Sequence, residues 1–142
     1  MHVSDSLIRQ WTSVVNDTLA APPTLLPAKI SAGGSISPAV TVPKGMRLWA
    51  LALPAEWTQS AISYAISFDN RTFYQPVDGA GSPLVETAHA VGGTAFLVCS
   101  FALLRAAFVK IRSGASAEEP TPQTSDRTLQ LLFLNHNVPT IF

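Results

Sequence analysis

The sequence predicts a mainly β protein built as an antiparallel β-sandwich. Short apolar segments recur at spacings of roughly 8–12 residues, and turns rich in Gly, Pro and Asp separate them. These segments do not alternate with long helical stretches, which argues against a parallel sheet with crossover helices. The 142 residues suffice for one domain with its own core, and the single cysteine excludes an internal disulfide.

The beginning of the chain predicts one N-terminal amphipathic helix. Its apolar residues recur at the spacing of one helix face, at Leu7, Ile8, Trp11, Val14 and Val15. A helix of about 15 residues is marginal alone in water, so we expect this stripe to pack on the domain, a sister subunit or another protein. The pair Pro22-Pro23 ends the helix, and the stretch up to Pro27 is expected to be an extended connector. Residues 1–27 therefore form an arm.

Residues 28–134 carry the predicted strands. Met46–Leu53 is apolar on both faces, which indicates a central strand. Ala61–Phe68 alternates large apolar with small residues, so one face should meet solvent, which favours a sandwich over a barrel. Further strands are expected within Ile30–Val42, Thr72–Val77, Leu84–Ala90, Phe96–Leu104, Phe108–Ile111 and Leu129–Leu134, with a polar loop over Ser113–Asp126. Arg112 and Asp126 flank this loop and are expected to pair across its base.

Residues 135–142 form an apolar C-terminal tail. Val138, Ile141 and Phe142 have no reason to be apolar in a soluble monomer unless the tail docks on something. Together with the helix stripe, these three residues are the candidate interface of the protein.

The charge balance excludes several classes of partner. Charged residues make up only 13% of the chain, and nine basic residues balance nine acidic ones. A nucleic-acid binder or a protein of anionic membrane surfaces would show a basic excess, so we expect neither partner. The longest apolar region, Ala95–Ile111, is too short and too often interrupted to span a bilayer. Weak charge gives little protection against self-association, so we expect a homo-oligomer with much of its surface covered.

No motif predicts an enzyme, a metal site or a bound cofactor. The three histidines, His2, His89 and His136, are scattered and show no metal-ligand spacing. Cys99 lies in an apolar run and is interpreted as a buried thiol. Three aspartates fall in turns, where carboxylates commonly accept hydrogen bonds from backbone N–H groups: Asp69, Asp78 and Asp126. Phosphate-binding loops and nucleophile motifs are absent from the sequence.

Aromatic residues gather in the middle of the chain, at Trp49, Trp57, Phe68, Phe73 and Tyr74. Two or more exposed rings beside Asp, Asn or Arg would suit carbohydrate binding, because aromatic rings stack on pyranose faces. The other interpretation is a packed core with one or two interface anchors.

The order of several segments resembles a group of small tailed-bacteriophage proteins encoded among virion genes. The segments are Leu53–Thr58, Ala61–Asp69 and Thr72–Tyr74, followed later by Phe108–Gly114 and Asp126–Leu131. The resemblance covers Lys29–Phe133. The chain departs from the pattern at Asn70, where the pattern usually has Gly; Asn tolerates the left-handed turn conformation.

The resemblance implies a virion structural protein, expected to be a capsid decoration or cement protein that binds and stabilises the head shell. Its partner would be the major capsid protein or another virion protein, and its oligomer a trimer. It would be made in the host cytoplasm and end in the phage particle. The segment order is also similar to galactose-binding-like jelly rolls, which implies a jelly-roll layout. The alternative function is therefore a carbohydrate-binding module of a phage head fibre or tail.

Overall fold

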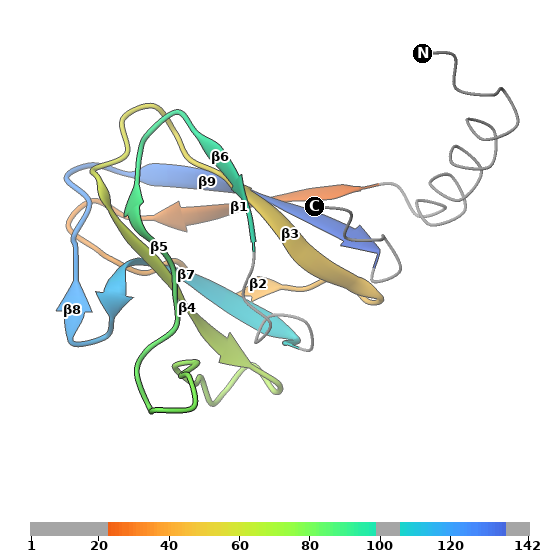
Figure 1. Ribbon diagram of the computed structural model, residues 1–142. Coiled ribbons are helices and arrows are strands. Elements are labelled where there is room, and N and C mark those ends of the chain that lie inside the picture. The colour runs from red at the N-terminus through yellow and green to blue at the C-terminus, as the bar shows by residue number, and fades with distance from the viewer. Residues whose placement is uncertain (1–22, 99–105, 136–142) are drawn as a thin grey trace, which may run out of the picture.

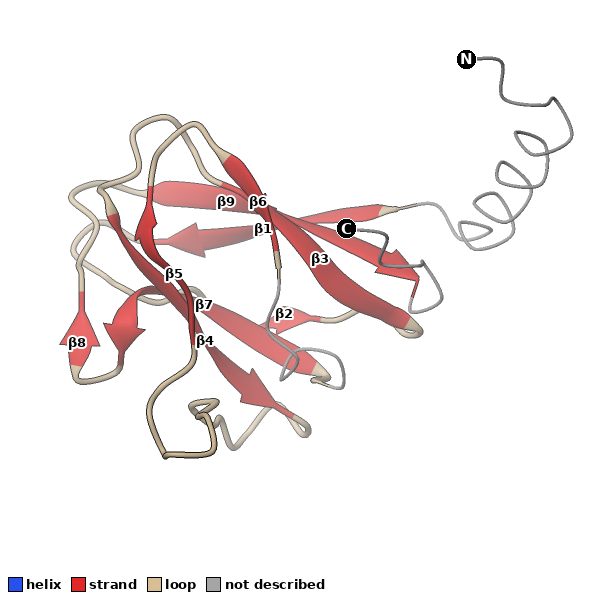
Figure 2. Cartoon of the chain, in the orientation of Figure 1, coloured by secondary structure: helices blue, strands red, loops and turns tan. Residues whose placement is uncertain are grey.

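The computed structural model describes residues 23–98 and 106–135, and all regular secondary structure within them is β (Figures 1 and 2). The strands are β1 (Thr24–Ile30), β2 (Val40–Thr41), β3 (Met46–Ala52), β4 (Ser60–Ser67), β5 (Val85–Ala90), β6 (Ala95–Leu97), β7 (Phe108–Ser116), β8 (Glu119–Pro120) and β9 (Arg127–Asn135). The predicted mainly β class is confirmed. The predicted helix lies outside the described residues.

Two antiparallel sheets make up the domain. One has the strand order β1-β9-β3-β6, and the other has the order β2-β7-β4-β5 with β8 paired to β7. Leu51 of β3 and Leu131 of β9 in the first sheet belong to the same buried cluster as Ile62 of β4 and Ile111 of β7 in the second. The two sheets therefore share one hydrophobic core, and Figure 1 shows them as separate layers.

The prediction of a central strand at Met46–Leu53 is confirmed. β3 lies between β9 and β6, and Leu48 and Leu51 are buried in the core. A shift in the pairing with β9 between Leu48 and Ala50 marks a β-bulge, which allows two core leucines to be three residues apart. Ala50 and Ala52 lie on the opposite face of the sheet.

The first strand begins earlier than the sequence indicated. β1 starts at Thr24 and pairs with β9 as far as Ile30, so Thr24–Pro27 belong to the sheet and not to a connector. The predicted connector was wrong because of Pro27. Proline has no N–H group to donate within a sheet, so its presence argues against a strand. β1 is an edge strand, where a missing donor is tolerated. At the other end, β9 continues to Asn135.

Two further predicted elements differ from the structure. Thr72–Val77 is not a strand and makes only isolated bridges, one between Tyr74 and Ile66 and one between Val77 and Pro83. The predicted polar loop over Ser113–Asp126 contains the end of β7 and all of β8. Gly114 makes this hairpin possible, because a Cβ there would lie 2.5 Å from the Glu119 carbonyl oxygen and its φ is +132°.

Candidate functional site

Two aromatic side chains are exposed side by side where β4 ends. Phe68 directly follows β4, and Tyr74 is held beside that strand by two backbone hydrogen bonds with Ile66. The ring centroids of Phe68 and Tyr74 are 6.3 Å apart and the rings are inclined by 43°. The two residues are 62% and 53% exposed, so together they form a small apolar patch on the surface.

The turn between these rings is held by hydrogen bonds to side chains. Asp69 Oδ1 accepts from the Arg71 and Thr72 backbone N–H groups at 2.9 and 3.0 Å, and Ser67 Oγ accepts from the Asn70 N–H at 2.9 Å. The hydrogen bonds from Thr72 and Arg71 lower the pKa of the Asp69 carboxyl below its usual value. Asn70 has a φ of 61°, so the expected left-handed turn is confirmed.

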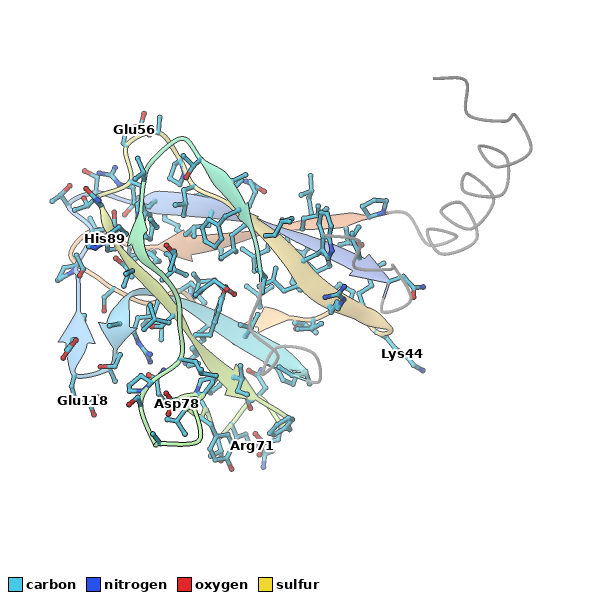
Figure 3. The ribbon with its side chains drawn as sticks, viewed as in Figure 1. Lys44, Glu56, Arg71, Asp78, His89 and Glu118 are labelled. Carbon is cyan, nitrogen blue, oxygen red and sulfur yellow. The ribbon has the colours of Figure 1, made fainter. Side chains whose placement is uncertain are left out.

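We call residues 68–74 the aromatic turn. The Asp69 Oδ2 atom, the Asn70 amide and the Arg71 guanidinium make no hydrogen bond to a described residue, and all three residues are exposed. Figure 3 shows Arg71 at the end of the molecule that this turn forms. The turn therefore presents two apolar rings and three polar groups to solvent on one ordered backbone.

The face of β4 expected to meet solvent is covered. Ser63, Ala65 and Ser67 are all buried. The cover comes from side chains of the neighbouring strand β7 and from Phe73 and Gln75. Arg112 Nη1 donates to Gln75 Oε1 and lies 3.4 Å from Ser63 Oγ. Long side chains thus lie over the small ones, which alternation along β4 alone could not reveal.

Lys110 and Phe73 make a second contact on this face. The ammonium nitrogen of Lys110 lies 4.1 Å from the Phe73 ring centroid, within the range of a cation–π interaction. Lys110 and Phe73 are both partly buried. Phe73 therefore belongs to the cover of the sheet and not to the exposed aromatic pair.

The predicted pair between Arg112 and Asp126 is wrong. Arg112 is buried on the face just described, and burial lowers the pKa of its guanidinium while Glu118 opposes that effect. Asp126 lies 3.2 Å from Lys29 Nζ, and its Oδ1 accepts a hydrogen bond from the Ala32 N–H at 2.8 Å. Asp126 thus fixes the turn after β1.

A buried glutamine ties three loops together at one end of the sheets. Gln123 is fully buried; its Oε1 accepts from the Thr58 N–H, and its Nε2 donates to the Thr58 carbonyl and to Ser113 Oγ. The backbone of Gln123 also exchanges hydrogen bonds with Gly33 and Gly34. Every polar group of this side chain is used, so the cluster is structural. The sequence does not predict this cluster, because a glutamine in a polar segment is usually exposed.

The outer face of the four-stranded sheet carries an apolar row. Leu25 of β1 lies opposite Leu132 of β9, Leu132 lies opposite Ala50 of β3, and Ala50 lies opposite Leu97 of β6. Directly opposed residues point to the same side of a sheet, and the neighbours of Leu132, Leu131 and Phe133, fill the core. The four residues therefore line the outer face from one edge of the sheet to the other. Leu25 is 63% exposed and Leu97 is 37% exposed.

The candidate polar residues have structural surroundings. The prediction that Asp69, Asp78 and Asp126 accept hydrogen bonds from backbone N–H groups in turns is confirmed. Asp78 Oδ1 accepts from the Ala80 and Ser82 N–H groups. His89 is exposed on β5, whereas His2, His136 and Cys99 lie outside the described residues. Within residues 23–98 and 106–135, no group of three or more His, Cys, Asp or Glu side chains could hold a metal ion. No helix in this part of the chain is long and apolar enough to cross a membrane.

The predicted interface residues are not among those the structure describes. These are Leu7, Ile8, Trp11, Val14 and Val15 in the arm and Val138, Ile141 and Phe142 in the tail. Their role in an interface stays a prediction. Of the other clustered aromatic residues, Trp57 belongs to the core, and Trp49 is half-buried at the bulge of β3.

Comparison of the chain with models of protein families, with curated proteins and with solved structures gave no match. The resemblance to phage virion proteins therefore stays an expectation drawn from the sequence. The apolar row and the aromatic turn are the two surfaces of the described residues that bear on function.

Proposed function

We propose that this protein is a bacteriophage virion structural protein, a jelly-roll-like β-sandwich that decorates and stabilises the capsid. The observation that carries the proposal is the apolar row Leu25–Leu132–Ala50–Leu97, which crosses all four strands of one sheet. The resemblance of the segment order to small phage virion proteins, which is an expectation from the sequence, supports the same role. The row is then the surface that contacts the capsid shell.

The physical chemistry of the row suits such a contact. Fully burying an exposed leucine contributes about 1.5–3 kcal/mol before ordering costs. Leu25 is 63% exposed, but Leu97 is 37% exposed and Leu132 is already half-buried, so the row supplies only a modest affinity per copy. A shell that holds many copies, or a homo-oligomer such as a trimer, multiplies weak contacts into tight binding. With 13% charged residues and no net charge, the chain depends on apolar area more than on electrostatic attraction.

The test measures binding of the purified protein to capsids stripped of minor proteins, together with its oligomeric state by sedimentation. We expect Leu25→Ser and Leu97→Ser to weaken capsid binding at least about tenfold, because each places a polar group on the row. Val91→Ser is the matched control, since Val91 is exposed in the turn after β5 and lies off the row. Equal capsid binding by the row variants and the control would refute the docking role of the row.

A further inference from the structure

We infer that the aromatic turn, residues 68–74, is a carbohydrate-binding site that recognises a pyranose ring. This assigns to one place the activity of the carbohydrate-binding alternative, and it does not depend on the proposed docking of the row. The exposed pair Phe68 and Tyr74 is the first observation behind it, and the polar groups that separate the two rings are the second.

The rings supply the apolar half of sugar recognition. One face of a pyranose displays several C–H groups, which pack on the face of an aromatic ring. Phe68 and Tyr74 are inclined by 43° and therefore do not cover each other face to face. Both keep more than half of their surface exposed, so a ring face is accessible to a ligand. With their centroids 6.3 Å apart, the two rings contact each other, so a sugar would pack on their exposed faces and not between them.

The turn between the rings supplies the polar half. Sugar hydroxyls both donate and accept hydrogen bonds. Asp69 Oδ2 can accept, the Arg71 guanidinium can donate, and the Asn70 amide can do both. The Asp69 and Ser67 hydrogen bonds already order this backbone, so binding would cost little loop entropy.

The same composition disfavours a protein contact at this turn. Protein interfaces place apolar anchors at a centre that is depleted of charged residues. Here a carboxylate and a guanidinium lie within three residues of Phe68, so a flat apolar partner would bury both charges. A nucleic-acid strand would meet the Asp69 carboxylate, and the chain has no basic excess to attract it.

The position of the turn leaves it accessible when the row is covered. The aromatic turn follows β4 of the five-stranded sheet, whereas the row lies on the outer face of the four-stranded sheet. The shared core separates the two sheets, and Figure 1 shows the end of β4 away from β1 and β9. A copy docked through the row can therefore present the turn to the outside.

The test uses the full chain labelled with ¹⁵N and titrated with methyl glycosides of glucose, galactose, mannose and N-acetylglucosamine, followed by amide NMR shifts. We expect at least one sugar to shift the amides of residues 68–74 and no other contiguous segment. Phe68→Ala and Tyr74→Ala should each weaken binding of that sugar at least about tenfold, as the loss of a central anchor residue does at other binding sites. Val91→Ala, which also removes an exposed apolar side chain, is the control and should bind as the native chain does.

A variant that preserves the turn guards against loss of folding. Asn70→Gly keeps the positive φ and removes only the amide, so it should stay folded and bind the sugar more weakly. The inference is overturned if none of the four sugars shifts these amides, or if the ring variants bind like the control. It is also overturned if Phe68→Ala weakens capsid binding while sugar binding is unchanged. The sugar titration contains no capsid, so its failure is distinct from failure of the proposed docking.

Discussion

Replacing the buried Gln123 tests whether one side chain holds an end of the domain together. Its amide makes three hydrogen bonds, to Thr58 N–H at 2.8 Å, to the Thr58 carbonyl at 3.1 Å and to Ser113 Oγ at 2.8 Å. A net hydrogen bond contributes about 0.5–1.5 kcal/mol, and a buried partner left unsatisfied costs about 1–3 kcal/mol. We therefore expect Gln123→Met, which keeps the volume, to lower the free energy of unfolding by about 2–4 kcal/mol.

The assay is equilibrium unfolding in urea, with the midpoint and slope compared between variants. Gln123→Ala adds a cavity to the lost hydrogen bonds and should cost more than Gln123→Met. Gln130→Ala is the matched control, because Gln130 is exposed on β9 and should change stability by less than about 0.5 kcal/mol. A loss below about 1 kcal/mol for Gln123→Met would refute the reasoning, because it would mean that water replaces the amide.

Three further predictions concern acid stability, a glycine and the arm. Because the Ala32 N–H donates to Asp126, the pKa of this carboxyl lies below its ordinary 3.8. The stabilisation is therefore complete above pH 3.8 and is lost as the pH falls through the lower folded value. Asp126→Asn should thus reduce the fall of the urea midpoint at acid pH. The same fall in the variant and in the native chain would contradict this role of Asp126. Gly114→Ala should lower the urea midpoint strongly, because its Cβ would meet backbone at 2.5 Å; a native-like midpoint would show that β8 can move away. Deleting residues 1–22 should leave a folded domain by circular dichroism but weaken assembly, and Trp11→Ala should account for much of the loss. Unfolding of the shortened chain, or unchanged sedimentation, would contradict this role of the arm.

Elements governed by local chemistry could be predicted from the sequence. β3 is apolar on both faces and is central; the turns at Asp69 and Asp78 follow from carboxylates that accept nearby N–H groups. β1 was missed because Pro27 is acceptable in a strand only at an edge, and edge position is a property of the whole sheet. Local sequence patterns therefore predict whether a segment is a strand or a turn better than they predict its position in the sheet.

The surfaces could be predicted only in part, because they depend on register between distant segments. The exposed pair of Phe68 and Tyr74 was among the five clustered aromatic residues, but the sequence could not separate it from Phe73, which lies under Lys110. The contacts of Arg112 were mispredicted because Gln75 reaches it from a segment 37 residues away. The apolar row requires the pairing of four strands, which no single strand encodes.

The register also explains why an apolar outer row need not compromise folding. Leu132 lies between two core residues of β9, Leu131 and Phe133, and a slip by one position would exchange the two faces of the strand. The apolar run Leu131–Leu134 specifies register weakly, but the first half of β9 alternates exposed Thr128 and Gln130 with buried Leu129 and Leu131. Directly before β9, Asp126 also contacts Lys29 of β1 and Ala32 in the turn after β1, which adds a small contribution to the same register. A slip by one position would also place Thr128 and Gln130 in the core, and this cost keeps Leu132 on the outer face.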